Sequence, residues 1–120
     1  VVAAGATANF FGIEGAQEHA LPLYTRSQAL AIRDEVFSHL ERAAARDPDR
    51  ELRIIVVGGG ATGVETAGAL AELRNRDMAV TYPELDPART HITLLEMMPV
   101  LLKPFDVGKV ADVLLSVSKK

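Results

Sequence analysis

The chain has 120 residues, no cysteine and a formal net charge of −3 at pH 7. This length allows one compact domain with its own core, and a composition of 48% apolar and 24% charged residues is typical of a globular protein. The absence of cysteine excludes disulfides and thiolate metal sites, and without a basic cluster there is no reason to expect nucleic acid as a partner.

The N-terminal part of the sequence predicts a strand end, a loop and a long helix. Residues 1–4 are apolar, and residues 9–15 contain the glycines and aromatic side chains of a loop. A helix is predicted from Thr25, because Thr25 and Gln28 have the spacing of a capping box and apolar residues then recur at intervals of three and four. Pro48 ends this helix, since proline disfavours the α conformation of the residue before it.

The rest of the chain predicts alternating strands and helices. Residues 53–57 are mostly β-branched and indicate a strand buried on both faces of a parallel sheet, and residues 64–76 follow as a helix with small residues on one face. Residues 77–90 contain two prolines and are expected to form an extended connection or surface insertion. A second strand at 91–96 and a last helix at 106–117 complete an α/β fold. We expect a Rossmann-like βαβ unit with helices on both faces of a parallel sheet.

The turn between the first of these strands and its helix has the Gly-x-Gly-x-x-Gly pattern of a dinucleotide-binding site. We expect Gly58 to permit the tight turn, Gly60 to leave room for the pyrophosphate, and Gly63 to let the helix pack close to the strand. Backbone N–H groups at the start of the helix would then stabilise the phosphates. A tight turn without a ligand is the alternative. The predicted cofactor-binding residues of this motif are Gly58, Gly59, Gly60, Ala61, Thr62 and Gly63.

Two glutamates are candidates for further contacts with the dinucleotide. Glu96 ends the second strand, where an acid accepts hydrogen bonds from the adenosine ribose. It lies much farther beyond Gly63 than the usual interval of about 20 residues, so this role requires residues 77–90 to loop out. A solvated carboxylate is the alternative for Glu96. Glu65, expected in the first helical turn, either stabilises the helix dipole or lies beside the nicotinamide.

The other polar and sulfur-containing residues indicate no chemistry of their own. His19, His39 and His91 are scattered without the spacing of metal ligands, so we expect them in structural or surface positions. Met97 and Met98 are expected to contribute packing. We therefore predict no catalytic acid, base or nucleophile in this chain and no metal site.

Several motifs together resemble the type II NADH dehydrogenase family. They are the Asn-Phe-Phe-Gly-Ile-x-Gly of residues 9–15, the glycine turn with its flanks at 56–72, and the segments 82–87, 94–96 and 99–106. This combination is specific and extends over nearly the whole chain, whereas the glycine pattern alone is generic.

The resemblance implies an FAD-dependent NADH:quinone oxidoreductase of the pyridine nucleotide-disulfide oxidoreductase superfamily. NADH would reduce FAD, and the flavin would pass electrons to a quinone at the membrane. The chain would be the NAD(H)-binding fragment, with residues 1–24 leaving the flavin domain of the parent and residues 25–120 forming a truncated NAD(H)-binding domain. FAD would lie in the parent, so the fragment is not expected to turn over. Ala61 stands where the family often has Pro, and Ala4 where it usually has Thr, which weakens the detailed match only locally.

Some of the expected partners and the location of the parent follow from the same resemblance, and the other expectations follow from the sequence itself. NADH, the parent's flavin domain and the quinone are the expected partners, and a homodimer through exposed apolar surfaces is a further one. We expect a cytoplasmic fragment, because no leader or apolar span of about 18 residues is present. The parent would be peripheral on the inner face of the cytoplasmic membrane. The alternatives are the NADH domain of another flavin-dependent pyridine nucleotide oxidoreductase, or a non-catalytic nucleotide-sensing module.

Overall fold

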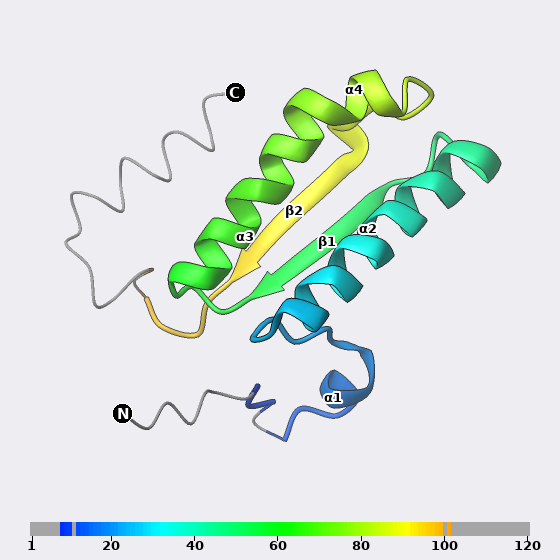
Figure 1. Ribbon diagram of the computed structural model, residues 1–120. Coiled ribbons are helices and arrows are strands. Elements are labelled where there is room, and N and C mark those ends of the chain that lie inside the picture. The colour runs from blue at the N-terminus through cyan, green and yellow to red at the C-terminus, as the bar shows by residue number, and fades with distance from the viewer. Residues whose placement is uncertain (1–7, 11, 100, 102–120) are drawn as a thin grey trace. The chain divides into compact units, whose positions relative to one another are not determined.

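The structure, a computed structural model, describes residues 8–10, 12–99 and 101 (Figure 1). The chain divides into two compact units, Val1–Arg42 and Ala43–Lys120. The strand predicted at residues 1–4 and the helix predicted at 106–117 lie outside the described residues. Among the helices that the structure describes, none has the length and hydropathy needed to cross a membrane.

The first unit contains a turned loop, a short helix and most of a long helix. The N–H of Ile13 donates to the carbonyl of Phe10 over 2.9 Å, and the glycines at 12 and 15 have φ of 70° and 76°. The segment is therefore the predicted loop. It leads into α1 (Ala16–His19), which the sequence pattern did not predict, and then into α2 (Arg26–Arg46), which lies where the periodicity placed it.

Thr25 and Gln28 form the predicted capping box at the start of α2. The N–H of Gln28 donates to Oγ1 of Thr25 over 3.3 Å, and the N–H of Thr25 donates to Oε1 of Gln28 over 3.1 Å. The N–H of Tyr24 also donates to Oε1 of Gln28, over 2.8 Å. These bonds satisfy N–H groups that have no partner within the helix, and they fix the residue at which α2 begins.

Replacement of Thr25 by alanine is expected to lower the free energy of unfolding by about 1 kcal/mol, because the N–H of Gln28 loses its acceptor. Chemical denaturation followed by circular dichroism measures the loss. Gln28→Glu is the matched control: it keeps an acceptor for the N–H of Thr25 and should change stability by less than about 0.5 kcal/mol. A Thr25→Ala chain as stable as the wild type would show that this cap contributes nothing.

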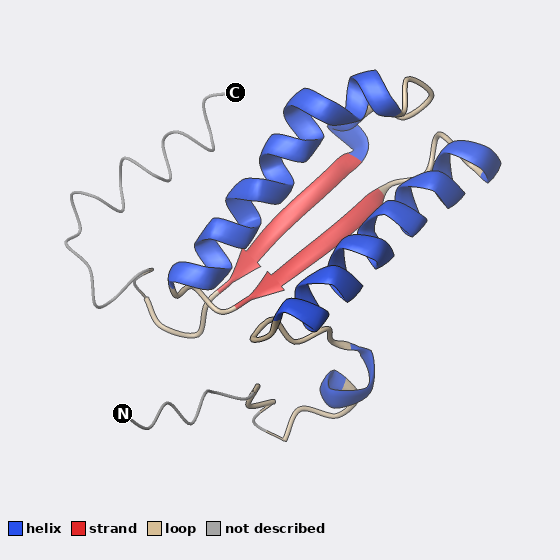
Figure 2. Ribbon diagram, in the orientation of Figure 1, coloured by secondary structure: helices blue, strands red, loops and turns tan. Residues whose placement is uncertain are grey.

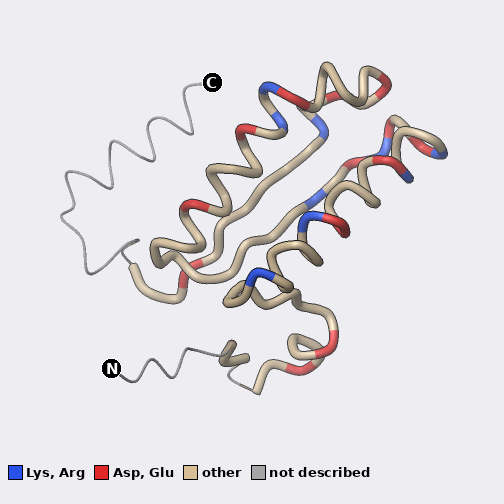
Figure 3. The backbone as a smooth tube through the Cα atoms, in the orientation of Figure 1, with Lys and Arg blue, Asp and Glu red and all other residues tan. Residues whose placement is uncertain are grey.

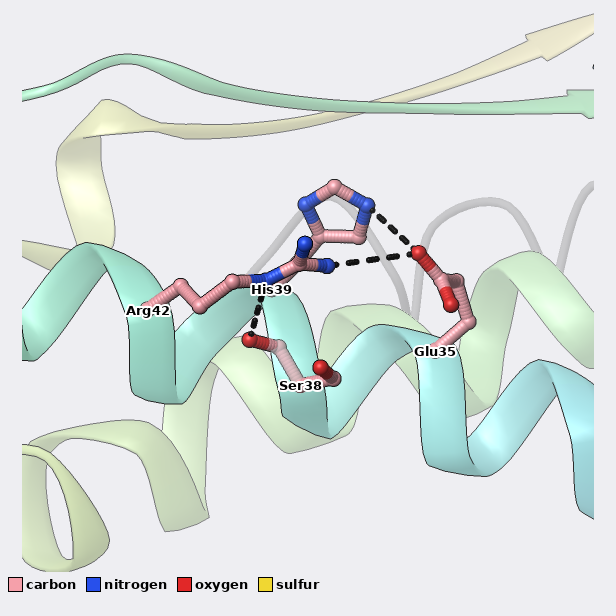
Figure 4. A network of polar contacts seen from close by, with 4 residues as sticks. All are labelled: Glu35, Ser38, His39 and Arg42. Carbon is pink, nitrogen blue, oxygen red and sulfur yellow. Dashed lines mark hydrogen bonds and ion pairs between the residues drawn. The ribbon is translucent and has the colours of Figure 1, made fainter.

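The exposed surface of α2 carries a small network of polar contacts (Figure 4). Oε1 of Glu35 accepts from Nε2 of His39 over 2.9 Å and lies 3.4 Å from Nη2 of Arg42. The Nε of Arg42 also donates to the carbonyl of Ser38 over 3.0 Å. The side chains of Glu35, His39 and Arg42 are all more than half exposed, so solvent screens the pairs and each contributes about 0.5 kcal/mol at most.

The second unit is built on two parallel strands, β1 (Leu52–Val57) and β2 (Thr90–Leu95), joined through a long helical connection (Figure 2). Leu52 pairs with Thr90 and Val57 pairs with Leu95. The helix α3 (Ala61–Glu72) contacts both strands and lies along one face of the sheet. Both strands lie within a residue of their predicted positions, and their parallel pairing is confirmed.

Side chains alternate between the two faces of this sheet. Val56 and Leu94 are paired in the register and half-buried, whereas their neighbours Ile55 and Val57 are 60% and 79% exposed. The prediction that the first strand is buried on both faces is therefore wrong for the described residues. An unbroken apolar run does not distinguish a strand covered on two sides from one whose second face is open.

The connection between the strands differs from the prediction at residues 77–90. The helical path continues beyond α3 through a π-helical turn (Leu73–Asp77) and α4 (Met78–Thr81), so residues 77–81 are helical rather than extended. Met78 explains the extension, because its side chain is 1% exposed and its sulfur accepts a hydrogen bond from Oγ1 of Thr90 over 3.5 Å. The helix thereby contacts the first residue of β2. Only the segment after Tyr82 turns back, ending in a short 3-10 helix (Pro87–Arg89).

Candidate dinucleotide-binding site

The chain turns from β1 into α3 within three glycines. The N–H of Gly58 donates to the carbonyl of Leu95 over 2.8 Å, which extends the contact between the strands by one bond. Gly58 then has φ of 106°, a backbone conformation that favours glycine because it has no Cβ. Gly60 is the N-cap residue of α3, and the helix begins at Ala61. The predicted strand, glycine turn and helix are therefore all present.

Gly63 allows α3 to approach this turn. A Cβ at this position would collide with the carbonyl oxygen of Gly58 and would lie 3.7 Å from Cδ1 of Leu94. Backbone atoms of the turn cannot move aside as a flexible side chain can. This geometry agrees with the packing role that the sequence motif predicts for Gly63.

The space above Gly60 is open. A Cβ at Gly60 would meet no atom of the described residues within 4 Å, although its φ of −73° suits any residue. Among the described residues no side chain caps α3, so the N–H groups at Ala61 and Thr62 in its first turn receive no acceptor from those side chains. Such groups, together with the helix dipole, stabilise an anion. The geometry therefore leaves room for a phosphate group against the start of α3.

The described residues around this turn include carboxylates and no cation. The sequence has no Lys or Arg between Arg53 and Arg74, and Figure 3 shows no basic residue at the junction of β1 and α3. Within this part of the structure, backbone N–H groups are therefore the donors available to an anion.

Glu96 lies beside the glycine turn, directly after β2. Its Oε2 accepts from the N–H of Gly59 over 2.5 Å, and its Oε1 accepts from the N–H of Met98 over 2.8 Å. The hydrogen bonds from Met98 and then Gly59 hold the pKa of the Glu96 carboxyl below its usual range, with a smaller lowering from Met97, while partial burial opposes them. The side chain is half-buried and hydrogen-bonded rather than simply solvated.

The long interval between the glycines and Glu96 has a different cause from the one predicted. Residues 77–90 do not loop out as a whole, because their first part prolongs the helix. The added helical turns carry the chain past the start of β2, and the strand then returns to the glycine turn. Glu96 thus reaches the predicted edge of the sheet, and its contact with the ribose remains a prediction.

Glu65 is exposed and lies one turn further into α3 than predicted. The helix begins at Ala61, so its first turn contains no acidic residue and Glu65 opens the second. A charge there gains little from the helix dipole, whose effect falls off within the first turn. The nicotinamide contact is the interpretation of Glu65 that remains a prediction.

For the residues expected to have no chemical role, the structure agrees with the prediction for the histidines and differs from it for the methionines. His19, His39 and His91 are exposed, in agreement with the surface positions expected for them. The packing role predicted for Met97 and Met98 is wrong, because these side chains are 81% and 41% exposed. Both follow Glu96 directly, where β2 has ended, and no helix or strand of the described residues covers them. Within the described residues, no three His, Cys, Asp or Glu side chains form a group that could hold a metal ion.

Two contributions to the site escape reasoning from sequence. The N–H of Met98 holds one oxygen of Glu96, and residues of any type offer such a group, so no sequence signal marks it. Leu101 lies against Gly59, where a Cβ would contact its Cδ2. The Leu-Leu pair in the family-like segment after Pro99 is the only signal that pointed to that residue.

Comparison with known proteins identifies the family. Residues 1–119 match the sequence model of the pyridine nucleotide-disulphide oxidoreductases, and the chain belongs to this family. It is 34% identical over 108 residues to a type II NADH:quinone oxidoreductase of Mycobacterium tuberculosis, covering 87% of this chain and 23% of that protein. It is 39% identical over 111 residues to an external alternative mitochondrial NAD(P)H-ubiquinone oxidoreductase of Arabidopsis thaliana, covering 88% of this chain and 19% of that protein.

A solved structure gives the same result. The fold matches NDH2 from Plasmodium falciparum in complex with NADH with a TM-score of 0.82 and 26% sequence identity, covering 94% of this chain and 24% of that one. The α/β Rossmann-like fold and the resemblance to type II NADH dehydrogenases are thus confirmed. The chain spans about a quarter of the length of these relatives or less.

Proposed function

We propose that this chain is the NADH-binding domain of a flavin-dependent NADH dehydrogenase that passes electrons from NADH through FAD to a quinone. The observation that carries the proposal is the open space at Gly60, at the start of α3, in a turn whose preceding residue, Gly59, is bonded to the carboxylate of Glu96. A plain tight turn requires neither that space nor an acid held beside it. The similarity to type II NADH:quinone oxidoreductases supports the reaction.

The described residues fit the two ends of an adenosine diphosphate group. The pyrophosphate would lie over Gly60 and accept hydrogen bonds from the first N–H groups of α3, which have no side-chain cap. The adenosine ribose would donate to Glu96, whose carboxylate is ionised at neutral pH and accepts hydrogen bonds. Glu65, exposed on α3, would face the nicotinamide end. These contacts bind and orient NADH and supply no acid, base or nucleophile.

The electron acceptor lies outside this site in our proposal. FAD, when bound by the flavin domain of the parent, would take the hydride of NADH and pass its electrons to the quinone. Residues 1–24 would connect to that flavin domain, residues 25–120 would form the NAD(H)-binding domain, and this chain alone would not turn over. We place the parent at the inner face of the cytoplasmic membrane and include a homodimer among its assemblies.

The test of this function is a titration of the wild-type chain and Glu96→Ala with NADH and NADPH. We expect the wild type to prefer NADH by at least about tenfold, because a carboxylate accepts from a ribose diol and repels a 2′-phosphate. The exposed Met97 and Met98 after it offer that phosphate no cation. Glu96→Ala should lose most of the preference.

Glu65→Ala is the matched control, because it removes a side chain of the same charge from α3 in the same unit. This substitution should leave the preference for NADH over NADPH unchanged. Equal affinity of the wild type for NADH and NADPH, or an unchanged ratio in Glu96→Ala, would show that another residue contacts the ribose. No measurable binding of either nucleotide would contradict the proposed function itself.

A further inference from the structure

The carboxylate of Glu96 connects the two loops that leave the parallel strands. One oxygen holds the N–H of Gly59 in the loop after β1, and the other holds the N–H of Met98 in the loop after β2. The neighbouring N–H of Gly58 is held by the carbonyl of Leu95. Two successive N–H groups of the glycine turn are therefore bonded to the end of β2.

Gly59 lies in close contact with the carboxylate of Glu96. It is buried, whereas Gly60 next to it is exposed. A Cβ at Gly59 would lie 2.8 Å from Oε2 and 3.0 Å from Cβ of Glu96, and would also contact Leu101. The middle glycine thus lets the acid approach the backbone of the turn closely, whereas the space at Gly60 is not filled by any described residue.

We propose that Glu96 is a positioning residue for the glycine turn: by holding the N–H of Gly59 it sets the turn in its nucleotide-binding conformation before the nucleotide arrives. The inference rests on the proposed function for its ligand, but adds a role that does not require contact with the ribose. A turn that is already ordered loses less conformational freedom when a pyrophosphate binds, so the affinity for NADH rises.

Both roles are compatible in one side chain. An ionised carboxylate offers about four lone-pair positions, and the two N–H groups occupy one on each oxygen. The remaining positions stay available to the ribose hydroxyls. Glutamine would not serve in this way, because its amide has a single acceptor oxygen and its NH₂ group would face one of the two N–H donors.

The first experiment measures the Gly59 amide without any nucleotide. In the ¹⁵N-labelled 120-residue chain, hydrogen exchange at Gly59 is compared between wild type, Glu96→Gln and Glu96→Asp. Aspartate keeps the charge but is one methylene shorter, so it separates position from charge. We expect exchange at Gly59 to be at least about tenfold faster in both variants, because a hydrogen bond to a charged acceptor is lost. Glu65→Gln is the control and should not change it.

The amide of Gly58 is the internal reference in this experiment, since its partner is a backbone carbonyl. In the Glu96 variants the Gly58 amide should stay protected from hydrogen exchange while the Gly59 amide exchanges faster. Unchanged exchange at Gly59 in both Glu96 variants would overturn the positioning role. Equal loss of protection at Gly58 and Gly59 would also overturn the positioning role, because Glu96 would then support strand pairing in general.

The second experiment separates positioning from ribose recognition. An NADH analogue without the adenosine 2′ and 3′ hydroxyls gives Glu96 no ribose partner, so a pure ribose contact predicts equal affinity of wild type and Glu96→Gln. We expect Glu96→Gln to bind the analogue several-fold more weakly. Equal affinity would overturn the proposal. A chain that binds no nucleotide at all would contradict the proposed function, while the exchange result at Gly59 would still decide whether Glu96 orders the turn.

Discussion

The Gly63→Ala chain is expected to lose about 1–3 kcal/mol of its free energy of unfolding, together with most of its affinity for NADH. The added methyl would overlap the carbonyl oxygen of Gly58, a backbone atom in the turn. Relief requires α3 to move away from β1, which also displaces the N–H groups at the start of the helix. Urea denaturation and nucleotide titration on the same preparation measure the two effects.

Gly60→Ala is the matched comparison for stability, since a methyl at that position meets no atom of the described residues. A Gly63→Ala chain as stable as the wild type would show that α3 can shift from the turn without cost. Comparable destabilisation by the two substitutions would show that loss of glycine, and not the contact with Gly58, is responsible.

For the Gly60→Ala chain we expect the opposite combination, with stability retained and NADH binding reduced by at least about a hundredfold. The φ of −73° at Gly60 suits alanine, and alanine reduces the freedom of the unfolded chain, so the free energy of unfolding should stay level or rise slightly. The methyl would, however, occupy the space assigned to the pyrophosphate. Displacing the phosphates by the width of a methyl breaks about two charged hydrogen bonds, at about 1.5–3 kcal/mol each.

Isothermal titration calorimetry with NADH measures this loss, and circular dichroism confirms that the variant is folded. If Gly60→Ala binds NADH as tightly as the wild type, the pyrophosphate does not lie over Gly60. The open space would then belong to a different ligand or to none.

The parts of the fold with a strong local pattern could be predicted from the sequence. The run of β-branched residues located β1, and the capping box at Thr25 located the start of α2. The helical conformation of residues 77–81 was missed because the two prolines that follow favoured an extended connection. Its stability depends on the burial of Met78 against Thr90, a contact between segments that no local pattern contains.

The site divides in the same way. The glycine pattern identified the turn, because the tight conformation and the close approaches in such a turn require glycine, and glycine can be recognised in the sequence. The pattern did not distinguish Gly60, beside which there is open space, from Gly59, which is packed against Glu96 and Leu101, since both residues are glycine. The bond between Gly59 and Glu96 follows from the pairing of Val57 with Leu95, which sets the two strand ends side by side. That register is a property of the sheet and appears only in three dimensions.

The bond from Gly59 to Glu96 also bears on attempts to redesign the nucleotide preference of such a domain. Exchanging the acid after β2 for a neutral or basic residue is the direct way to admit a 2′-phosphate, but here it would also remove the acceptor for a buried backbone N–H. An unsatisfied buried donor is destabilising. A redesigned domain would therefore need a second substitution that returns an acceptor to the N–H of Gly59. In libraries that vary position 96 alone, the variants that admit a 2′-phosphate would also be the destabilised ones.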